Sequence, residues 1–318
     1  MVDAIATREA YGRALERVGA THPEIVVLDA DLSKSTMTTY FAKKFPERFF
    51  QMGIAESNMV GVSAGLATCE KKPFVSTFAI FCSRAWEQIR NTVARGGLPV
   101  SFCLSHAGLS VGEDGASAQA CEDIAIMRAI PNMSVIVPAD AVETEQVIEF
   151  LADNVQILGG PVYVRLTRNK VPVIHGKDYK FTFGKADIIK RGSSADKQLT
   201  YIACGQMVAY AIKAAETLEG EGVSATVVNM STIKPIDVSA IIDAARKTKR
   251  IITIEEHSII GGLGEAVAAV VSEHYPIQVK RIGVHDTFGE SGTAEELFQK
   301  YGLGLDSILD TTRKFLSA

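Results

Sequence analysis

A lone carboxylate begins an apolar segment in the stretch Gly53-Ile54-Ala55-Glu56-Ser57-Asn58-Met59-Val60-Gly61. Glu56 is the only charged residue in positions 49–69, and the spacing of Gly61 and Gly65 predicts a buried helix that approaches another element closely. A carboxylate buried in such a place costs several kcal/mol unless it is hydrogen-bonded or protonated. Glu56 is therefore either a functional acid or a structural residue that the helix dipole favours at a partly solvated helix start.

The composition indicates a folded chain with more than one domain. Its 318 residues suggest about two domains, and 47% of them are hydrophobic, which is enough for sizeable cores. The net charge of −4 and the lack of a basic patch argue against nucleic acid as a partner. There is neither a signal-peptide pattern nor an apolar run of about 18 residues, so we expect a cytoplasmic protein that binds no membrane.

The five cysteines are scattered in apolar contexts, at Cys69, Cys82, Cys103, Cys121 and Cys204. Their number is odd, and no two of them have the CxxC spacing. We therefore expect buried thiols in a reducing compartment, and no metal ligands in this chain.

Helices and strands are predicted to alternate along the first half of the chain. Apolar residues at spacing four predict an amphipathic helix over residues 6–18, and the run 24–31, which ends in carboxylates, predicts a buried strand with polar residues at its tip. Further strands are expected at 74–81, 100–105, 133–137 and 162–166, and further helices at 55–69, 83–96, 119–129 and 140–153. Such alternation indicates an α/β fold with a mostly parallel sheet flanked by helices.

Residues 169–187 interrupt this pattern with a proline, glycines and charged residues, as a linker would. A second alternating set follows, with strands expected at 199–203, 225–229, 250–255 and 278–284. We therefore predict two α/β domains, each a mostly parallel sheet flanked by helices. The first covers residues 1–172, the linker 173–185 and the second domain 186–318.

The clearest polar cluster is the loop 105–115, which follows a predicted strand. Ligands bind at the carboxyl ends of parallel strands in open α/β sheets, and the glycines of this loop keep its backbone accessible. His106 could donate to a substrate oxygen or exchange a proton with it, and Asp114 could accept a hydrogen bond from a hydroxyl. Asp114 and Gly115 alone would equally fit a turn. The chain has no dinucleotide fingerprint, P-loop or nucleophile elbow.

Two aromatic and three basic residues are further candidates. Phe78 and Phe81 stand three apart and share a face if the segment is helical there, where they would stack on a flat heterocycle or form part of the core. Arg8, Arg165 and Arg168 could bind a phosphate or carboxylate in a bidentate way. Each by itself is equally compatible with an ordinary charged residue on the surface. The segments 255–257, 261–264 and 286–292 have no metal-ligand spacing, and we expect them to form contact surfaces.

In their order and spacing, these segments resemble the C-terminal part of a transketolase, a family that uses thiamine diphosphate. The resemblance runs from residue 6 to residue 305. The matching segments are Ala6-Thr7-Arg8, Asp29-Ala30-Asp31-Leu32-Ser33-Lys34-Ser35, Gly53-Ile54-Ala55-Glu56, Thr77-Phe78, Ser105-His106, Gly112-Glu113-Asp114-Gly115 and Leu166-Thr167-Arg168.

The resemblance implies a role for each matching residue. Glu56 would hydrogen-bond a ring nitrogen of the cofactor's aminopyrimidine and so promote loss of the thiazolium proton. The catalytic candidates are therefore Glu56 and, beside the substrate, His106. The cofactor-binding candidates are Asp31, Ile54, Glu56, Phe78 and Phe81. The substrate-binding candidates are Arg8, Ser35, His106, Asp114 and Arg168, with His106 and Asp114 on sugar hydroxyls and the others on the phosphate.

Half of the family's cofactor site is missing from this sequence. Full-length transketolases have an N-terminal domain whose Gly-Asp-Gly motif binds the diphosphate through Mg²⁺ or another divalent cation, and no Gly-Asp-Gly occurs here. The resemblance therefore implies a split transketolase, in which a separate N-terminal chain supplies that domain. The active site would lie at the subunit interface, in an assembly of two copies of each chain.

Three positions depart from the family pattern. Ala118 and Ser57 stand where many relatives have histidine, and Arg84 stands where an aromatic residue often completes the pyrimidine pocket. The resemblance implies that the histidine replaced by Ala118 lies near the reacting carbons, so we expect Ala118 to affect substrate choice or rate. The same two domains occur in 1-deoxy-xylulose-5-phosphate synthase and in the beta chain of the 2-oxo acid dehydrogenase decarboxylating component, but the Ser105-His106 loop resembles transketolase more closely.

The expected activity is transfer of a two-carbon ketol unit from a ketose phosphate to an aldose phosphate, as in the pentose phosphate pathway. The enzyme alternative is the beta chain of a 2-oxo acid dehydrogenase, which needs a lipoyl partner and an electron acceptor. The non-enzyme alternative is a regulatory paralogue that has lost activity. The departure at Ala118 is compatible with this alternative, whereas the presence of Glu56, His106, Asp114 and Arg168 argues against it.

Overall fold

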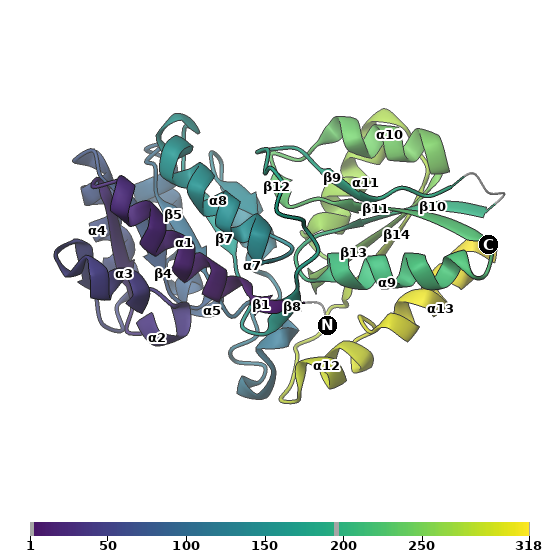
Figure 1. Cartoon of the computed structure of the whole chain (residues 1–318), viewed down its shortest axis with the longest axis horizontal. Helices are drawn as coiled ribbons and strands as arrows, with labels where there is room; N and C mark the ends of the chain where they lie inside the picture. The colour runs from purple at the N-terminus through teal and green to yellow at the C-terminus, as the bar shows by residue number, and fades with distance from the viewer. Residues whose placement is uncertain (1–2, 194–196, 318) are drawn as a thin grey trace. The chain divides into compact units, whose positions relative to one another are not determined.

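A computed structural model describes residues 3–193 and 197–317 (Figure 1). The chain forms two compact units. The first consists of the residues up to Ala107 together with Ile126–Phe181, and the second of Gly108–Ala125 together with the residues from Thr182 onward. Each unit is a mostly parallel sheet flanked by helices, which confirms the predicted α/β fold. In the described ranges, no helix is both long and apolar enough to cross a bilayer.

The sheet of the first unit has the strand order β6-β7-β5-β4-β2-β3, and all neighbouring strands are parallel. Its strands are β2 (Ile25–Asp29), β3 (Phe49–Gln51), β4 (Lys72–Ser76), β5 (Ser101–Leu104), β6 (Ser134–Ile136) and β7 (Val162–Arg165). The short strands β1 (Ala4–Ala6) and β8 (Lys170–Pro172) pair antiparallel beside it. Every residue of β2, β4, β5 and β7 is buried, as expected for parallel strands with both faces covered.

Several helices flank this sheet: α1 (Thr7–Thr21), α2 (Ser33–Thr36), α3 (Thr39–Lys44), α4 (Glu56–Thr68), α5 (Ala79–Cys82), α6 (Trp86–Gln88) and α8 (Ala141–Asn154). Helix α1 has the predicted amphipathic pattern, because Ala10, Ala14 and Val18 are buried. Helix α7 (Asp123–Arg128) crosses the division between the two units.

The second unit contains a sheet of order β14-β13-β10-β11-β9, in which only the pair β11–β9 is antiparallel among the described strands. Its strands are β9 (Asp187–Lys190), β10 (Lys197–Ala203), β11 (Val223–Asn229), β13 (Arg250–Ser258) and β14 (Gln278–Val284), and β12 (Thr232–Lys234) lies outside this sheet. The helices are α9 (Met207–Glu219), α10 (Val238–Thr248), α11 (Leu263–His274), α12 (Ala294–Lys300) and α13 (Leu305–Ser317). Helices α9 and α13 lie on one side of this sheet, and α10 and α11 on the other (Figure 1).

Some predicted elements were wrong in extent. The strand expected at 74–81 ends at Ser76, and α5 begins at Ala79, because the chain turns helical at the sheet edge. The helix expected at 83–96 is irregular, with a 3-10 turn, the short α6 and the π-helical turn Ile89–Ala94. The helix expected at 119–129 begins only at Asp123.

The glycines of α4 do not support the close approach that their spacing predicted. Gly61 and Gly65 lie on the exposed side of the helix, and an added Cβ at either would meet no described atom within 4 Å. The buried side is formed by Met59, Val60, Ser63, Ala64 and Ala67.

Cys69, just beyond the helix, is exposed rather than buried, whereas the other four cysteines are buried. Burial raises the pKa of Cys82 to about 12, which keeps that thiol protonated.

Asp140 ties the start of α8 to the chain that leaves the first unit. Its carboxylate accepts hydrogen bonds from the backbone N–H groups of Glu143 at 2.9 Å, Ile174 at 2.8 Å and His175 at 2.7 Å, and its side chain is fully buried. Burial by itself raises the pKa of Asp140, but the hydrogen bonds and charge of His175 and the backbone amides outweigh it. The pKa therefore lies below its usual value.

We expect Asp140→Ala to lower the free energy of unfolding by about 2–4 kcal/mol, because several buried N–H groups lose their acceptor. The pKa of Asp140 is lower in the folded state than the value of 3.8 in the unfolded chain. The stabilisation is therefore fully present above pH 3.8 and is lost as the pH falls through the folded-state pKa. Urea unfolding between about pH 3 and pH 7 measures both effects. Asp153→Ala, at the exposed far end of α8, is the control, and equal losses in the two variants would contradict the assignment.

Candidate active site

Four polar segments follow neighbouring parallel strands of the first unit. Asp31 comes after β2, Phe78 after β4, His106 after β5 and Arg168 after β7. Because all four strands run in the same direction, their carboxyl ends lie at one edge of the sheet. Phe78 and Ser105 continue the pairing of β4 with β5 by an isolated parallel bridge. The fold thus gathers residues from distant parts of the sequence at the edge where ligands bind in such sheets.

Glu56 lies in a hollow at this edge, which we call the Glu56 hollow. It has a volume of about 280 Å³ and is lined by Ala30, Asp31, Leu32, Ile54, Glu56, Phe81 and Arg84. Glu56 is the first residue of α4 and is only 6% exposed, so it combines the helix-start position with burial. Ile54 is 77% exposed although it lines the hollow. A buried carboxylate in a mostly apolar hollow that opens to solvent can hydrogen-bond a bound heterocycle.

Arg84 lies at the mouth of the Glu56 hollow. Its Nη1 is 3.7 Å from Oε1 of Glu56, and its guanidinium lies over the ring of Phe81 at 5.3 Å from the centroid. The side chain of Arg84 is 63% exposed, so solvent screens this long ion pair. Arg84 therefore contacts the aromatic wall of the hollow through its cation.

Phe78 and Phe81 form one aromatic surface, as predicted for a helical turn at this place. Their rings stack with centroids 5.4 Å apart and planes inclined by 13°. Phe78 precedes α5 and Phe81 lies within it, so the spacing of three brings both rings to the same side. The ring of Phe78 also stacks on the imidazole of His106 at 3.7 Å. The aromatic surface thus connects the Glu56 hollow to His106.

His106 is buried and neutral. Burial and the positive charges of Arg8 and Arg168 lower the pKa of His106 to about 3. Its Nδ1 is 2.9 Å from Oγ of Ser105, which orients the ring. His106 and Asp31 both have positive φ, 57° and 62°, a conformation that costs on the order of 1–3 kcal/mol in a residue with a side chain and often marks functional sites. A neutral imidazole here can donate or accept one hydrogen bond but cannot bind an anion by charge.

Arg8 and Arg168 supply positive charge beside His106. Burial lowers the pKa of Arg8, and the charge of Arg168 lowers it further, so the two guanidinium groups act on each other. Nη1 of Arg8 donates to the carbonyl oxygen of Ser35 at 2.7 Å, which links α1 to α2. Nε of Arg8 is buried and has no hydrogen-bond acceptor among the described residues. Two neighbouring cations and a buried donor without an acceptor together form a suitable site for an anion.

Asp29 was missed as a site residue by the sequence analysis, which named it only as part of a strand end and of a matching segment. It is fully buried, and its carboxylate accepts hydrogen bonds from the Leu32 N–H at 2.7 Å and the hydroxyls of Thr36 at 2.7 Å and Thr38 at 3.0 Å. Burial raises the pKa of Asp29 against the effect of these bonds. The carboxylate therefore orders the turn that carries Asp31 and Ser35. An acid at a strand end followed by two threonines was the available signal.

Not every predicted residue belongs to the first unit. Asp114 is exposed and lies on the segment Gly108–Ala125 of the second unit, as does Ala118.

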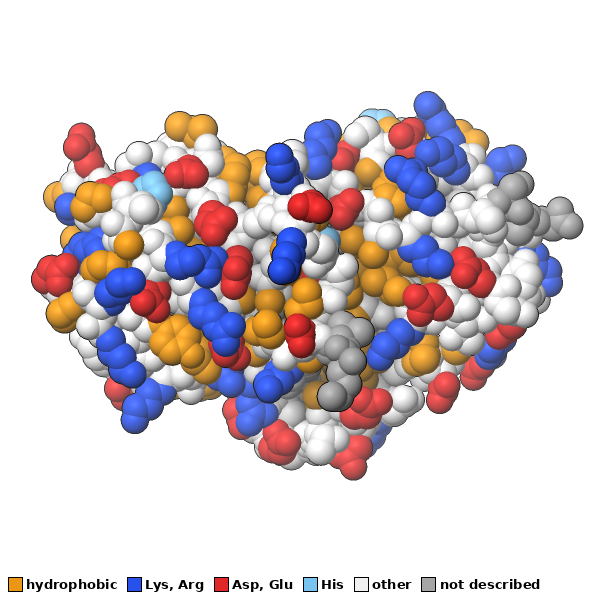
Figure 2. Space-filling model, in the orientation of Figure 1, with side chains coloured by type: hydrophobic (Ala, Val, Ile, Leu, Met, Phe, Trp, Pro, Cys, Tyr) orange, Lys and Arg blue, Asp and Glu red, His pale blue; other side chains and the backbone are white. Residues whose placement is uncertain are grey.

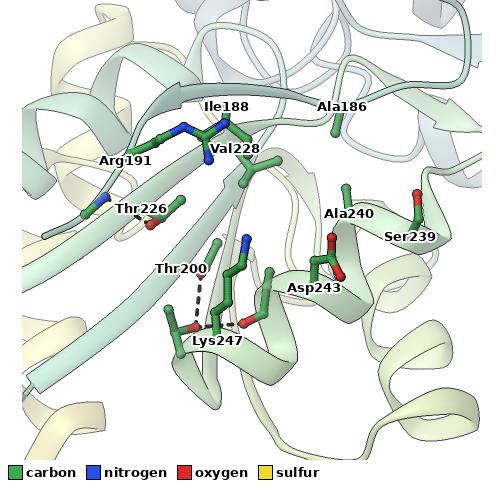
Figure 3. Close-up of a pocket in the computed structure, with 13 residues that line it drawn as sticks. Ala186, Ile188, Arg191, Thr200, Thr226, Val228, Ser239, Ala240, Asp243 and Lys247 are labelled. Carbon is green, nitrogen blue, oxygen red and sulfur yellow. Dashed lines mark hydrogen bonds between the residues drawn. The ribbon is translucent and has the colours of Figure 1, made fainter. Parts of the chain in front are cut away.

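A larger hollow of about 420 Å³ lies on the second unit between α10 and the strands β9, β10 and β11, with Arg191 and Lys247 among its lining residues (Figure 3). No predicted site residue lines it. On the face shown in Figure 2, acidic and basic side chains are interspersed.

The residues of the first unit fit the pyrimidine part of thiamine diphosphate. The Glu56 hollow offers one buried carboxylate and an aromatic wall, which suit a flat ring that carries nitrogen atoms. Across the described ranges, no cluster of three or more His, Cys, Asp or Glu residues could hold a metal ion.

Comparisons with known proteins identify the family. Residues 3–173 match the model of the transketolase pyrimidine binding domain, and residues 184–308 match that of the transketolase C-terminal domain. A putative transketolase C-terminal section from Methanocaldococcus jannaschii is 50% identical over 306 residues, which cover 95% of this chain and 93% of that protein. The transketolase of Rattus norvegicus is 40% identical over 313 residues, and there the chain spans only 49% of the relative.

A solved structure gives the same result. It is described as a split gene transketolase, an inactive beta4 tetramer, and it is 49% identical with a TM-score of 0.88 over 99% of both chains. The family models, the relatives and this structure agree over nearly the whole chain. The chain therefore belongs to the transketolase family, of which it carries the pyrimidine-binding and C-terminal domains.

Proposed function

We propose that this chain is the C-terminal subunit of a two-chain transketolase that transfers a two-carbon ketol unit from a ketose phosphate to an aldose phosphate. The observation that carries the proposal is the combination of the buried Glu56, the stacked Phe78 and Phe81 and the neutral His106 at one sheet edge. We place the domain boundaries at 1–172, 173–185 and 186–318.

Each residue has a task in this mechanism. When bound, thiamine diphosphate would supply a nucleophilic carbon for chemistry at the ketose carbonyl. Glu56 would hydrogen-bond a pyrimidine nitrogen, Phe78 and Phe81 would pack on the ring, and Asp31 and Ile54 would lie beside it. A divalent cation, Mg²⁺ or another, would be held by ligands on the partner chain.

The substrate is held by a second set of residues. His106, neutral at physiological pH, exchanges hydrogen bonds with substrate hydroxyls without competing for the phosphate. Arg8, Ser35 and Arg168 hold the phosphate, which provides the acceptor that Nε of Arg8 lacks. Asp114 accepts a hydrogen bond from a sugar hydroxyl.

The partner is an N-terminal transketolase chain that binds the diphosphate, in an assembly of two copies of each chain. The similarity to a protein described as a transketolase C-terminal section, 93% of which the chain covers, supports this partner. The similar beta4 tetramer is described as inactive, which agrees with a need for a second kind of chain.

The test is ketol transfer from xylulose 5-phosphate to ribose 5-phosphate with thiamine diphosphate and Mg²⁺. The chain is assayed alone and after mixing with the N-terminal chain from the same source. We expect activity only in the mixture. Activity of the chain alone would contradict the split site. Decarboxylation of a 2-oxo acid by the mixture, without ketol transfer, would favour the 2-oxo acid dehydrogenase beta chain instead.

A further inference from the structure

Two adjacent carboxylates on β13, Glu255 and Glu256, have different partners. Both are buried, and because side chains alternate along a strand they serve opposite faces of the sheet. Glu255 accepts hydrogen bonds from the N–H groups of Leu263 at 2.7 Å and Gly264 at 2.8 Å, which begin α11. This is a structural task, because it satisfies amides at a helix start.

Glu256 instead binds the segment Gly108–Ala125, which we call the substrate loop because it carries Asp114. Oε1 of Glu256 accepts a hydrogen bond from the Ser110 N–H at 2.5 Å. Nε2 of Gln206 donates to Oε2 of Glu256 and also to Oγ of Ser110 at 2.9 Å. Ser110, Gln206 and Glu256 are 2%, 5% and 3% exposed, so all three members of this cluster are buried. The loop residue Ser110 is thus held through both its backbone and its side chain.

The substrate loop has further attachments within the second unit. Nε2 of Gln119 donates to the carbonyl oxygens of Leu109 at 3.3 Å, Gly112 at 3.2 Å and Glu290 at 2.9 Å. Toward the loop's end, the Ser258 N–H donates to the Cys121 carbonyl oxygen at 2.7 Å. Gln119 therefore ties the second half of the loop to Leu109 and Gly112 in its first half and to Glu290, and Ser258 holds the end of the loop. Ser110 lies four residues before Asp114 in the chain, and Glu256 holds it there.

We propose that Glu256 is a positioning residue for substrate binding: it sets the place of Asp114 by holding Ser110, with Gln206 as its brace. The inference rests on the proposed function, in which Asp114 binds a sugar hydroxyl. It assigns to the second unit a task in substrate binding, performed by a residue that touches neither the cofactor nor the sugar.

A charge-assisted hydrogen bond from a buried amide to a carboxylate is stronger than a neutral one, and its loss leaves that amide without an acceptor. Glu256→Ala would release Ser110 and leave its N–H unsatisfied. Glu256→Gln would not, because its amide oxygen still accepts from the Ser110 N–H. Gln206 can rotate its own amide to accept from the new NH₂ group and from the Ser110 hydroxyl. The two variants at one position therefore separate positioning of the loop from the negative charge.

The first measurement is hydrogen exchange on the full chain, which needs no activity. We expect Glu256→Ala to speed exchange of the Ser110 amide by at least about tenfold, and Glu256→Gln to change it by less than about threefold. Glu255→Ala is the matched control, an equally buried carboxylate on the same strand, and it should speed exchange at Leu263 and Gly264 but not at Ser110. Equal acceleration at Ser110 in both alanine variants would overturn the proposal, because general destabilisation would then explain it.

The second measurement is steady-state ketol transfer after mixing with the N-terminal chain. Glu256→Ala should raise the KM for sugar phosphate by about 10-fold or more, leave the affinity for thiamine diphosphate unchanged, and be rescued by Glu256→Gln. If Glu256→Ala does not fold, Ser110→Ala, which removes only the hydroxyl, should raise the same KM by about 2–5-fold. An unchanged KM in the folded variants would overturn the proposal. Absence of ketol transfer in the wild-type mixture would overturn the proposed function, and exchange at Ser110 would still decide whether Glu256 holds the loop.

Discussion

Glu56→Gln should abolish ketol transfer in the mixture of this chain with the N-terminal chain, and the fold should survive. The glutamine keeps the size of the side chain in a hollow where Glu56 is 6% exposed, but it cannot hold the exchangeable proton at the pyrimidine nitrogen. General acid–base groups contribute about 10²–10⁴-fold, so we expect a loss of at least that size. The measurement is kcat with xylulose 5-phosphate and ribose 5-phosphate.

The control for Glu56→Gln is Glu70→Gln, the same exchange at an exposed position just beyond the other end of α4. Circular dichroism and thermal unfolding of both variants show whether the fold is kept. Activity of Glu56→Gln within a few-fold of wild type would exclude the proton-holding role. A loss of activity that is matched by a loss of folded protein would instead return Glu56 to the structural interpretation that its position at a helix start also allows.

The second large effect is expected for Arg168→Ala, which should raise the KM for phosphorylated sugars and change kcat much less. Burial is the main cause that lowers the pKa of Arg8 and of His106, and the charge of Arg168 lowers both further, as expected for a cation near these two side chains. Loss of a charge-assisted hydrogen bond costs about 1.5–3 kcal/mol, equivalent to about a 10–150-fold increase in KM. The measurement compares ribose 5-phosphate with ribose as acceptor.

Unphosphorylated ribose is the internal control, because it cannot use the proposed phosphate site. Arg13→Ala, which removes an exposed arginine from the outer side of α1, is the matched variant and should leave both KM values unchanged. An equal loss with the phosphorylated and the unphosphorylated sugar would refute the assignment of Arg168. The pKa of His106, about 3, adds an expectation: the imidazole contributes no change in substrate binding between about pH 5 and pH 8.

The sequence by itself determined the α/β class, because the alternation of buried strands with amphipathic helices is a local pattern. It also determined the candidate residues at strand ends, since a parallel sheet brings its carboxyl ends to one edge whatever the details of packing. The common side of Phe78 and Phe81 followed from a spacing of three in a helical turn. The roles expected for individual residues came from the order of the short segments that match the family. Hydrophobic periodicity alone does not give those roles.

Only the tertiary structure decided which of these residues act on one another. The stacking of Phe78 on His106 and the mutual effect of Arg8 and Arg168 join residues far apart in sequence. Close packing also decided that α4 exposes its glycines. Burial and hydrogen bonding depend on every neighbour in space, and for that reason the anchoring of the substrate loop by Glu256 could not be predicted from a linear pattern.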